Sequence, residues 1–302
     1  MEKNAQLTGH AACLGAYIIF GLNIILCKDI ALSRQIPPIA LFVFRAIGAT
    51  VLFWGMSYFL PKEKMSKKDL FMTFLASMLG LFVTQLSFLK AITMTTSIDA
   101  SIMSSLNPVM TMFVAAIFIH EPITLKKAGG VAISLCGVLI LIFNSITINS
   151  GADHTTPLGL LLMFCNGLAF ALYLGIFRPL ISRYSPVTFM KWMFLFSLIA
   201  SIPLGLRPVM NLDYAVVAPK VYLEIGYVII FATFIAYFLI PVGQKRLRPT
   251  IVSLYNYVQP IIAMVISVII GIDHLTWMKV LATVLVFTGV ALVNRSRAAS
   301  QQ

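Results

Sequence analysis

The chain has 302 residues, of which 60% are apolar and only 11% charged, and its mean hydropathy is +0.95. Soluble domains are about half apolar and about a quarter charged, so this composition excludes a cytosolic enzyme, a disordered protein and a secreted disulfide scaffold. The formal charge of +12 comes from basic residues in short loops between apolar runs, which favours a role in membrane topology over nucleic-acid binding.

Ten apolar runs follow one another along the chain, and each is close to the ~20 residues that a transmembrane helix needs. Runs of this length exclude an outer-membrane barrel, whose strands alternate in segments of about ten residues. The first run has no small-residue cleavage site and nine more follow it, so we predict a span and not a signal peptide. The sequence thus predicts an all-α integral membrane protein with ten transmembrane helices, at about residues 7–27, 38–60, 70–89, 98–119, 128–148, 157–177, 187–206, 225–243, 249–271 and 275–294.

Most of the 22 Lys and Arg residues fall on one side of the membrane when these spans are threaded in order. That side holds both termini and the basic segments Lys62–Lys68 and Lys245–Arg248. Because basic loops are retained in the cytoplasm, we predict a multi-pass protein of the cytoplasmic membrane with both termini inside the cell.

The two halves of the chain resemble each other. At an ungapped shift of 152 residues, segment 101–143 aligns with 253–295, and the matches include a mid-span proline, an acidic turn and a glycine deep in the next span. The matched pairs are Pro108 and Pro260, Glu121 and Asp273, and Gly137 and Gly289. Each copy, 1–148 and 153–302, has five spans, so the two copies cross the membrane in opposite directions. Such inverted-topology repeats are typical of secondary transporters, whose substrate sites lie near the midplane between the repeats.

Several stretches resemble the EamA type of the drug/metabolite transporter superfamily. They are Phe20-Gly21-Leu22-Asn23, Ser104-Ser105-Leu106-Asn107-Pro108-Val109, and His120-Glu121-Pro122-Ile123-Thr124 followed by Gly129-Gly130 and Gly137-Val138. The second copy departs from the family pattern, because Asp273 stands where the family usually has Glu. The resemblance covers essentially the whole chain. It implies a ten-helix secondary transporter of small metabolites, often an exporter, with a central cavity between its halves, and it leaves the substrate open.

Amide and hydroxyl side chains lie deep within several runs, where lipid offers them no hydrogen-bond partner. Asn107 and Gln259 directly precede the two mid-span prolines, which remove a helix hydrogen bond and free a carbonyl. We predict that Pro108 and Pro260 break their helices for gating. For the serines the alternative is close helix packing, since small residues let helices approach. The predicted lining of a central substrate-binding cavity is Asn23, Gln85, Ser101, Asn107, Tyr237, Tyr255, Tyr257 and Gln259.

Three ionisable residues lie in the outer half of predicted spans: Arg45, Asp99 and Glu224. Charges inside a membrane usually face a cavity or a partner, so we predict that these three line the outer mouth. The alternatives are that Arg45 extends to the outer headgroups and that the two acids are interfacial. Glu121 and Asp273 are predicted to be structural, because a carboxylate just past a helix can bond the first amides of the next one.

The sequence predicts no enzyme active site, metal or cofactor. The four cysteines lie in or at the ends of apolar runs and lack the Cys-x-x-Cys or Cys/His spacing of metal and redox sites; they are Cys13, Cys27, Cys136 and Cys165. No catalytic motif such as His-Glu-x-x-His occurs. The remaining alternatives are a membrane enzyme acting on a lipid-borne substrate, a channel, and a receptor or scaffold. Whether the chain is a monomer or a homodimer stays open.

The predicted function is a secondary transporter that moves a small metabolite by alternating access, as an exporter or an exchanger. The predicted cavity lining is mostly neutral, and an ion is costly to desolvate without a fixed countercharge. The solute is therefore expected to be neutral or zwitterionic, such as an amino acid. Arg45 would bind its carboxylate, and Asp99 or Glu224 its amine.

Single cysteines introduced at Met65 and Ala152 test the predicted topology. An impermeant thiol reagent added to intact cells should label position 152, and it should label position 65 only after the cells are permeabilised. Labelling of position 65 but not of 152 in intact cells would reverse the assignment of inside and outside.

Overall fold

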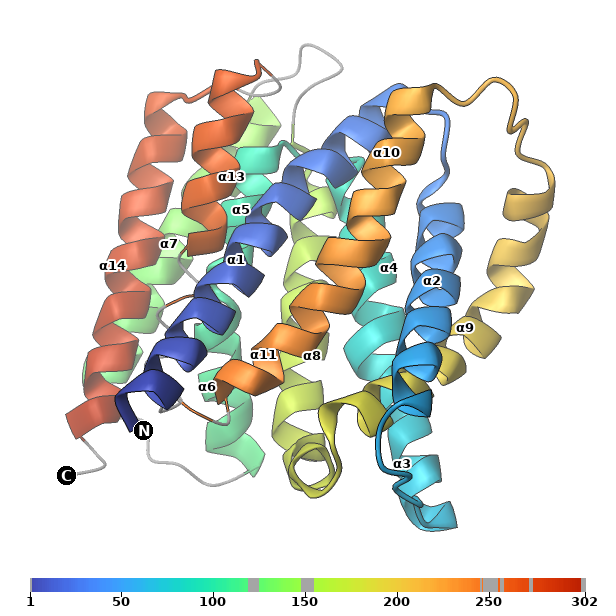
Figure 1. The fold of residues 1–302 in the computed structure, drawn as a ribbon. Helices are drawn as coiled ribbons and strands as arrows, with labels where there is room; N and C mark the ends of the chain where they lie inside the picture. Colours follow the sequence, from blue (N-terminus) through green and yellow to red (C-terminus); the bar gives the residue numbers. More distant parts are fainter. Residues whose placement is uncertain are drawn as a thin grey trace.

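The computed structural model describes residues 2–118, 125–147, 155–244, 246, 255, 258–271 and 274–299. Within these ranges the regular structure is entirely helical, without a strand, and each of the ten predicted runs contains a helix or an interrupted helix (Figure 1). In chain order the elements are α1 (Glu2–Ser33), α2 (Pro38–Tyr58), α3 (Lys67–Ser77), a π-helical segment (Met78–Val83), α4 (Thr84–Ile92), α5 (Ser97–Ser104), α6 (Asn107–Phe118), α7 (Leu125–Thr147), α8 (Pro157–Arg183), α9 (Pro186–Met210), α10 (Pro219–Tyr227), a second π-helical segment (Val228–Ile235), α11 (Ala236–Gln244), α13 (Val258–Ile269) and α14 (Trp277–Ala299).

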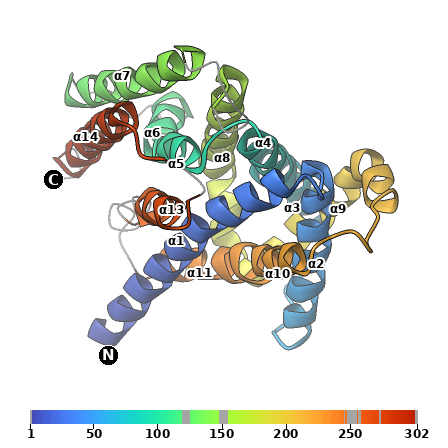
Figure 2. The same ribbon diagram turned by 90° about the horizontal axis from the view of Figure 1, so that it is seen from above.

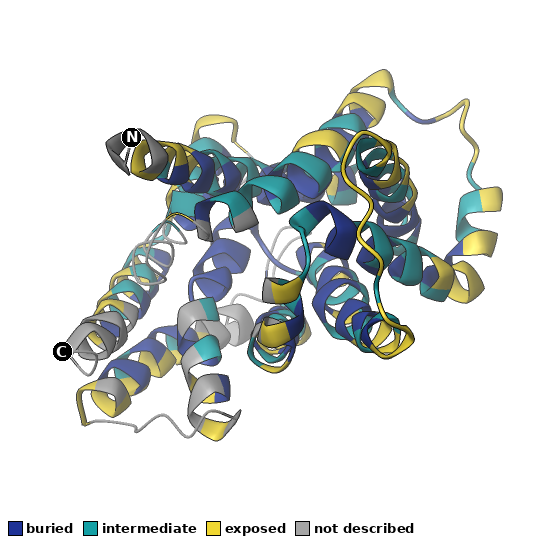
Figure 3. Cartoon of the chain, turned by 60° about the horizontal axis from the view of Figure 1, so that its bottom comes forward, coloured by how far each residue is buried: buried dark blue, intermediate teal, exposed yellow. Residues whose placement is uncertain are grey.

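Among the described residues, six helical stretches are long and apolar enough to cross a membrane. They are Gln6–Ser33, Pro38–Tyr58, Lys67–Ile92, Pro157–Phe177, Pro186–Met210 and Pro219–Ile240, and shorter apolar helices are Ala128–Ile140, Val258–Ile269 and Trp277–Gly289. Buried residues face the middle of the bundle, and many large apolar side chains are exposed on its outside (Figure 3). Such an exterior is stable in lipid and not in water, so the chain is a multi-pass membrane protein.

Local sequence signals set where several helices begin. Four helices have proline at their first position, where the missing N–H would have no partner in any case: α2, α8, α9 and α10. Four hydroxyl side chains accept a hydrogen bond from a first-turn amide of the helix that they precede: Ser66, Thr96, Thr156 and Ser185. The helix starts therefore follow from residues adjacent in sequence.

Three helical stretches depart from regular α-helix. The predicted fourth span is divided into α5 and α6, and α6 begins at Asn107, just before Pro108. The π-helical segments Met78–Val83 and Val228–Ile235 interrupt the predicted third and eighth spans. A shift of 152 residues moves Met78–Val83 to 230–235, which lies within the second π-helical segment. In each segment a backbone carbonyl accepts a hydrogen bond from a threonine hydroxyl five residues later. The Thr84 hydroxyl donates to the Leu79 carbonyl at 2.6 Å, and the Thr233 hydroxyl donates to the Val228 carbonyl at 2.7 Å.

The helices of the two halves pack into one another. Helix α1 packs against α11 and α13, and α8, its counterpart in the second half, packs against α4 and α6. The counterparts α2 and α9 pack together, as do α7 and α14, which lie side by side in Figure 2. Helix α1 begins and α14 ends at the same end of the bundle (Figure 1). Each half therefore completes the core of the other.

Matched glycines allow the close approach of α7 and α14. A Cβ atom on Gly137 would lie 2.8 Å from the carbonyl oxygen of Ala282, and one on Gly289 would lie 2.3 Å from the carbonyl oxygen of Gly130. These distances leave no room for a side chain unless a backbone moves. The two glycines are partners at the shift of 152 residues, so the same device acts from both helices.

Substitution of Gly289 by valine should force α14 away from α7 and lower the unfolding free energy by about 1–3 kcal/mol, the usual cost of overpacking. Thermal unfolding of the detergent-solubilised protein measures the effect. The control is Gly129→Ala on α7, where an added Cβ meets nothing within 4 Å. Equal stability of the Gly289→Val protein and the control would show that the two helices do not depend on this contact.

Candidate functional site

Arg45 lies inside the bundle, on α2. Its side chain is 3% exposed, and its Nε donates a hydrogen bond of 3.0 Å to Thr233 Oγ1 in the π-helical segment Val228–Ile235. The Thr233 hydroxyl in turn donates to the Val228 carbonyl at 2.7 Å. The guanidinium is therefore buried against the second half of the chain in this conformation.

A second polar contact joins the halves at Gln85 and Tyr237. Gln85 Nε2 on α4 donates a hydrogen bond of 3.3 Å to the Tyr237 hydroxyl on α11. These residues are 152 apart, the same offset at which the sequence predicts that the two halves of the chain correspond. The amide oxygen Oε1 of Gln85 is buried and has no hydrogen-bond partner in the described part of the chain, so the site retains a free acceptor.

Asn23 and Cys27 on α1 complete this group. Cys27 Sγ donates to Asn23 Oδ1 at 3.5 Å, and both residues are buried. Helix α1 also packs against the second π-helical segment and α11, which carry Thr233 and Tyr237. We name this group, drawn from α1, α2, α4, the second π-helical segment and α11, the central polar cluster: Asn23, Cys27, Arg45, Gln85, Thr233 and Tyr237.

Aromatic rings pack beside the central polar cluster. Tyr237 makes edge contacts with Phe20 and Phe194, at centroid distances of 5.9 and 5.7 Å. Phe53 stacks on Phe194 at 5.5 Å and contacts Phe234 at 4.8 Å. The polar cluster is thus bounded by a rigid aromatic wall built from four helical elements, which holds Tyr237 in place.

Other predicted cavity residues lie elsewhere. The Ser101 hydroxyl donates to Ile98 of its own helix at 2.7 Å, and the Tyr255 hydroxyl shares a hydrogen bond of 2.8 Å with His10 Nδ1. Asn107 Oδ1 is buried without a hydrogen-bond partner among the described residues and faces Gly167 of α8. Gln259 lies on α13, where its backbone carbonyl faces Gly21. Of the predicted lining, Gln85 and Tyr237 bond to each other directly, and Asn23 bonds to Cys27 on α1, which packs against the elements that carry Thr233 and Tyr237.

Some predicted residues fall outside the described residues: Tyr257, Glu121 and Asp273. Pro108 lies in the first turn of α6, next to the break after α5, and Pro260 is buried near the start of α13. Their predicted part in gating stays a prediction.

Asp99 is buried at the start of α5, in a network that ties three helices together. The Thr155 hydroxyl donates to the Asp99 carboxylate and accepts a 3.0 Å hydrogen bond from the Thr96 N–H. Lys279 Nζ on α14 donates to Thr96 Oγ1 at 3.1 Å. Asp99 is 3% exposed and Glu224, on α10, is 6% exposed. Both acids are thus buried in this conformation, and whether they line an outer mouth stays a prediction.

A further network, which the sequence did not indicate, ties the halves at the opposite end of the bundle. Arg183 Nη1 at the end of α8 donates to both carboxylate oxygens of Asp69 on α3, at 3.0 and 3.1 Å. The Tyr184 hydroxyl donates to the same carboxylate at 2.7 Å, and this hydrogen bond raises the pKa of Tyr184. Sequence reasoning missed Asp69 because it lies at a span end, and it missed Thr233 because only the π-helical turn aims that hydroxyl at Arg45.

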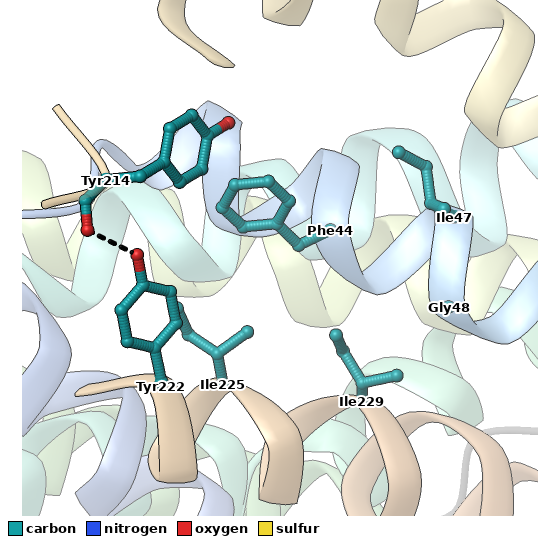
Figure 4. A pocket seen from close by; sticks show the side chains of 7 residues that line it. All are labelled: Phe44, Ile47, Gly48, Tyr214, Tyr222, Ile225 and Ile229. Carbon is teal, nitrogen blue, oxygen red and sulfur yellow. Dashed lines mark hydrogen bonds between the residues drawn. The ribbon is translucent and has the colours of Figure 1, made fainter. Parts of the chain in front are cut away.

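A hollow of about 290 Å³ lies between α2 and α10, and none of its lining residues belongs to the central polar cluster. Its wall is apolar except at one end, where the Tyr222 hydroxyl donates to the Tyr214 carbonyl at 2.7 Å (Figure 4). The lining residues are Phe44, Ile47, Gly48, Tyr214, Tyr222, Ile225 and Ile229. An apolar hollow offers nothing to orient a polar solute, so the central polar cluster remains the candidate site. The described residues contain no group of three His, Cys, Asp or Glu that could hold a metal ion.

Comparison with known proteins identifies a family model that matches this chain twice. The model of the EamA-like transporter family matches residues 7–143 and again residues 157–295. The uncharacterized transporter YetK of Bacillus subtilis strain 168 is 21% identical over 267 residues, covering 88% of this chain and 80% of that protein. An uncharacterized transporter of Archaeoglobus fulgidus is 25% identical over 266 residues, covering 87% and 91%.

A solved structure, titled only as a crystal structure of a protein, has the same fold. It matches with a TM-score of 0.62 and 17% sequence identity, over 99% of each chain. At this identity the similarity concerns the fold alone.

Replacement of Tyr237 by phenylalanine should lower the unfolding free energy by about 1–3 kcal/mol, because it leaves the buried Gln85 amide without a partner. The control is Tyr214→Phe, which removes an exposed hydroxyl that donates to Val209 at 2.9 Å, and it should change stability by less than about 0.5 kcal/mol. Unfolding in mixed detergent–SDS micelles measures both. Equal effects of the two substitutions would mean that the Gln85–Tyr237 bond contributes nothing beyond a surface contact.

Proposed function

This chain belongs to the EamA-like transporter family, and from that membership we propose that it carries a small neutral or zwitterionic metabolite, such as an amino acid, across the cytoplasmic membrane. As a member of the family it is a membrane transport protein, and the names of its relatives likewise indicate a transporter and not an enzyme. We propose that it works as an exporter or exchanger, with both termini in the cytoplasm.

The mechanism that we propose is alternating access between two inverted five-helix repeats, 1–148 and 153–302. The exchanged packing of α1 and α8 supports this proposal, since each of them contacts the third and fourth helical stretches of the other repeat. The Gln85–Tyr237 contact supports it as well, because equivalent residues meet there. In such a fold the halves rock around a site at their interface, which is where the central polar cluster lies. The break before Pro108 and the buried Pro260 are the proposed gating positions.

The observation that carries the proposed substrate class is the burial of Arg45. A charge inside a membrane protein is costly and normally has a partner. Within the described part of the chain, Arg45 bonds to the neutral Thr233, and no Asp or Glu carboxylate forms an ion pair with it within 4.0 Å. An anionic group on the solute would supply the missing countercharge. The other members of the central polar cluster are neutral, which favours a solute with a carboxylate and no large net charge.

Replacement of Arg45 by glutamine tests this proposal in proteoliposomes. Counterflow of a panel of radiolabelled metabolites should first identify a solute with saturable flux. For a carboxylate-bearing solute, Arg45→Gln should raise the half-saturating concentration about 10- to 100-fold, the equivalent of a charged hydrogen bond of ~1.5–3 kcal/mol. Arg207→Gln, at the exposed end of α9, is the matched control and should leave transport unchanged.

Two results would contradict the proposal. Unchanged affinity in a well-folded Arg45→Gln protein would make the arginine a structural residue that binds Thr233 and no solute. Flux that does not saturate and shows no counterflow would favour a channel.

A further inference from the structure

Three charged residues meet where α1 and α10 come together, at the end of the bundle opposite the N-terminus (Figure 1). Lys220 Nζ on α10 forms a close ion pair with Asp29 on α1. The same ammonium lies 3.5 Å from Glu224 Oε1, one helical turn along α10. The two carboxyl groups also lie close enough to interact with each other directly. Two acids thus share one lysine across the boundary between the halves of the chain.

Glu224 is the member of this group that water does not reach. The residue is 6% exposed, and both of its carboxylate oxygens are buried without a hydrogen-bond partner among the described residues. The Lys220 side chain is 72% exposed and is bound more closely by Asp29. A buried carboxylate without donors is costly to keep ionised, and a solvated lysine already paired with another acid offsets little of that cost.

The other groups that face Glu224 do not change this balance. Glu224 lies on α10, which packs against α1, α2 and the second π-helical segment. From α1 it faces the Asp29 carboxyl, which repels a second negative charge, and the Cys27 thiol. On α2 the buried cation is Arg45, which is bonded to Thr233. Two acids in contact with one ammonium leave one negative charge in excess, and acids that share a site in this way retain a proton.

We propose that Asp29 and Glu224 hold one proton between them while α1 and α10 are in contact, and that loss of this proton separates the two helices. The proton passes to water on that side of the membrane, and the carboxylate that remains becomes solvated as the helices part. This proton site lies at the boundary of the two repeats, so its occupancy sets whether this end of the transporter is closed. The site does not depend on the identity of the transported solute.

The sign of the pH effect follows from linkage. The closed arrangement binds one more proton than the open arrangement, so low pH favours closure and high pH favours opening. One proton limits the effect to about a tenfold change in the open-to-closed ratio per pH unit. Glutamine at position 224 keeps the shape of the protonated acid and carries no charge, so the closed arrangement should persist at every pH.

The experiment combines two measurements on the full chain in lipid nanodiscs. Infrared difference spectra between low and high pH detect the C=O band of a protonated carboxyl group. Pulsed EPR measures the distance between spin labels at Leu32 and Leu223, exposed positions on α1 and α10, with the four native cysteines replaced by serine. The variant is Glu224→Gln, and the matched control is Asp213→Asn, which neutralises an exposed acid before α10.

In the wild type and in Asp213→Asn, we expect a carboxyl band that disappears as the pH rises, together with a longer population in the distance distribution. In Glu224→Gln we expect the band to be absent and the distance to stay short at all pH values. The proposal is wrong if the band survives in Glu224→Gln, or if the distance in the wild type does not respond to pH. Failure of the Arg45 experiment would leave both of these readouts unaffected, so the two proposals can fail separately.

Discussion

Lipid provides no hydrogen-bond partner for a polar side chain, and this constraint decides where the polar residues of this transporter lie. The exterior of the bundle is apolar, so polar groups on the spanning helices must bond within their own helix or to a neighbouring one. Ser101 takes the first solution and bonds to Ile98. Arg45 and Gln85 take the second, and their partners Thr233 and Tyr237 belong to the other half of the chain. The polar contacts that hold the helices together therefore gather where the halves meet.

The close packing around these contacts has a different physical origin. Between helices in lipid there is little hydrophobic driving force, and van der Waals contact between close backbones replaces it. The glycines at 137 and 289 provide such contact between α7 and α14. Between α2 and α9, stacked rings such as Phe53 and Phe194 perform the same function. These two seams lie at opposite sides of the bundle (Figure 2), and each of them joins one helix from each half of the chain.

Both ends of the bundle are closed by polar contacts across the two halves. At one end Asp69 binds Arg183 and Tyr184, and at the other Asp29 and Glu224 meet through Lys220. The two ends differ in composition. Asp69 has several donors and can remain ionised, whereas the Glu224 oxygens have no hydrogen-bond partner among the described residues and only a 3.5 Å ion pair with the exposed Lys220. Under the proposed alternating access one end opens while the other stays closed, and the proposed proton on Asp29 and Glu224 would make their end the one that responds to pH.

The sequence by itself determined the features that depend on residues close together in the chain. Hydropathy over about 20 residues located the helices, proline and hydroxyl residues located several of their starts, and the shift of 152 residues matched the glycines of α7 and α14. The sequence also indicated that Asn23, Gln85 and Tyr237 were buried polar residues.

Only the tertiary structure decided their partners. A π-helical segment rotates the residues after it relative to a regular helix, so a periodic pattern cannot say that Thr233 meets Arg45. Likewise, Asp29 lies near the end of α1, Glu224 lies near the start of α10 far along the chain, and each looks interfacial alone. Contacts between distant segments depend on how whole helices pack, and that packing is settled by the sum of many weak contacts that no short stretch of sequence contains.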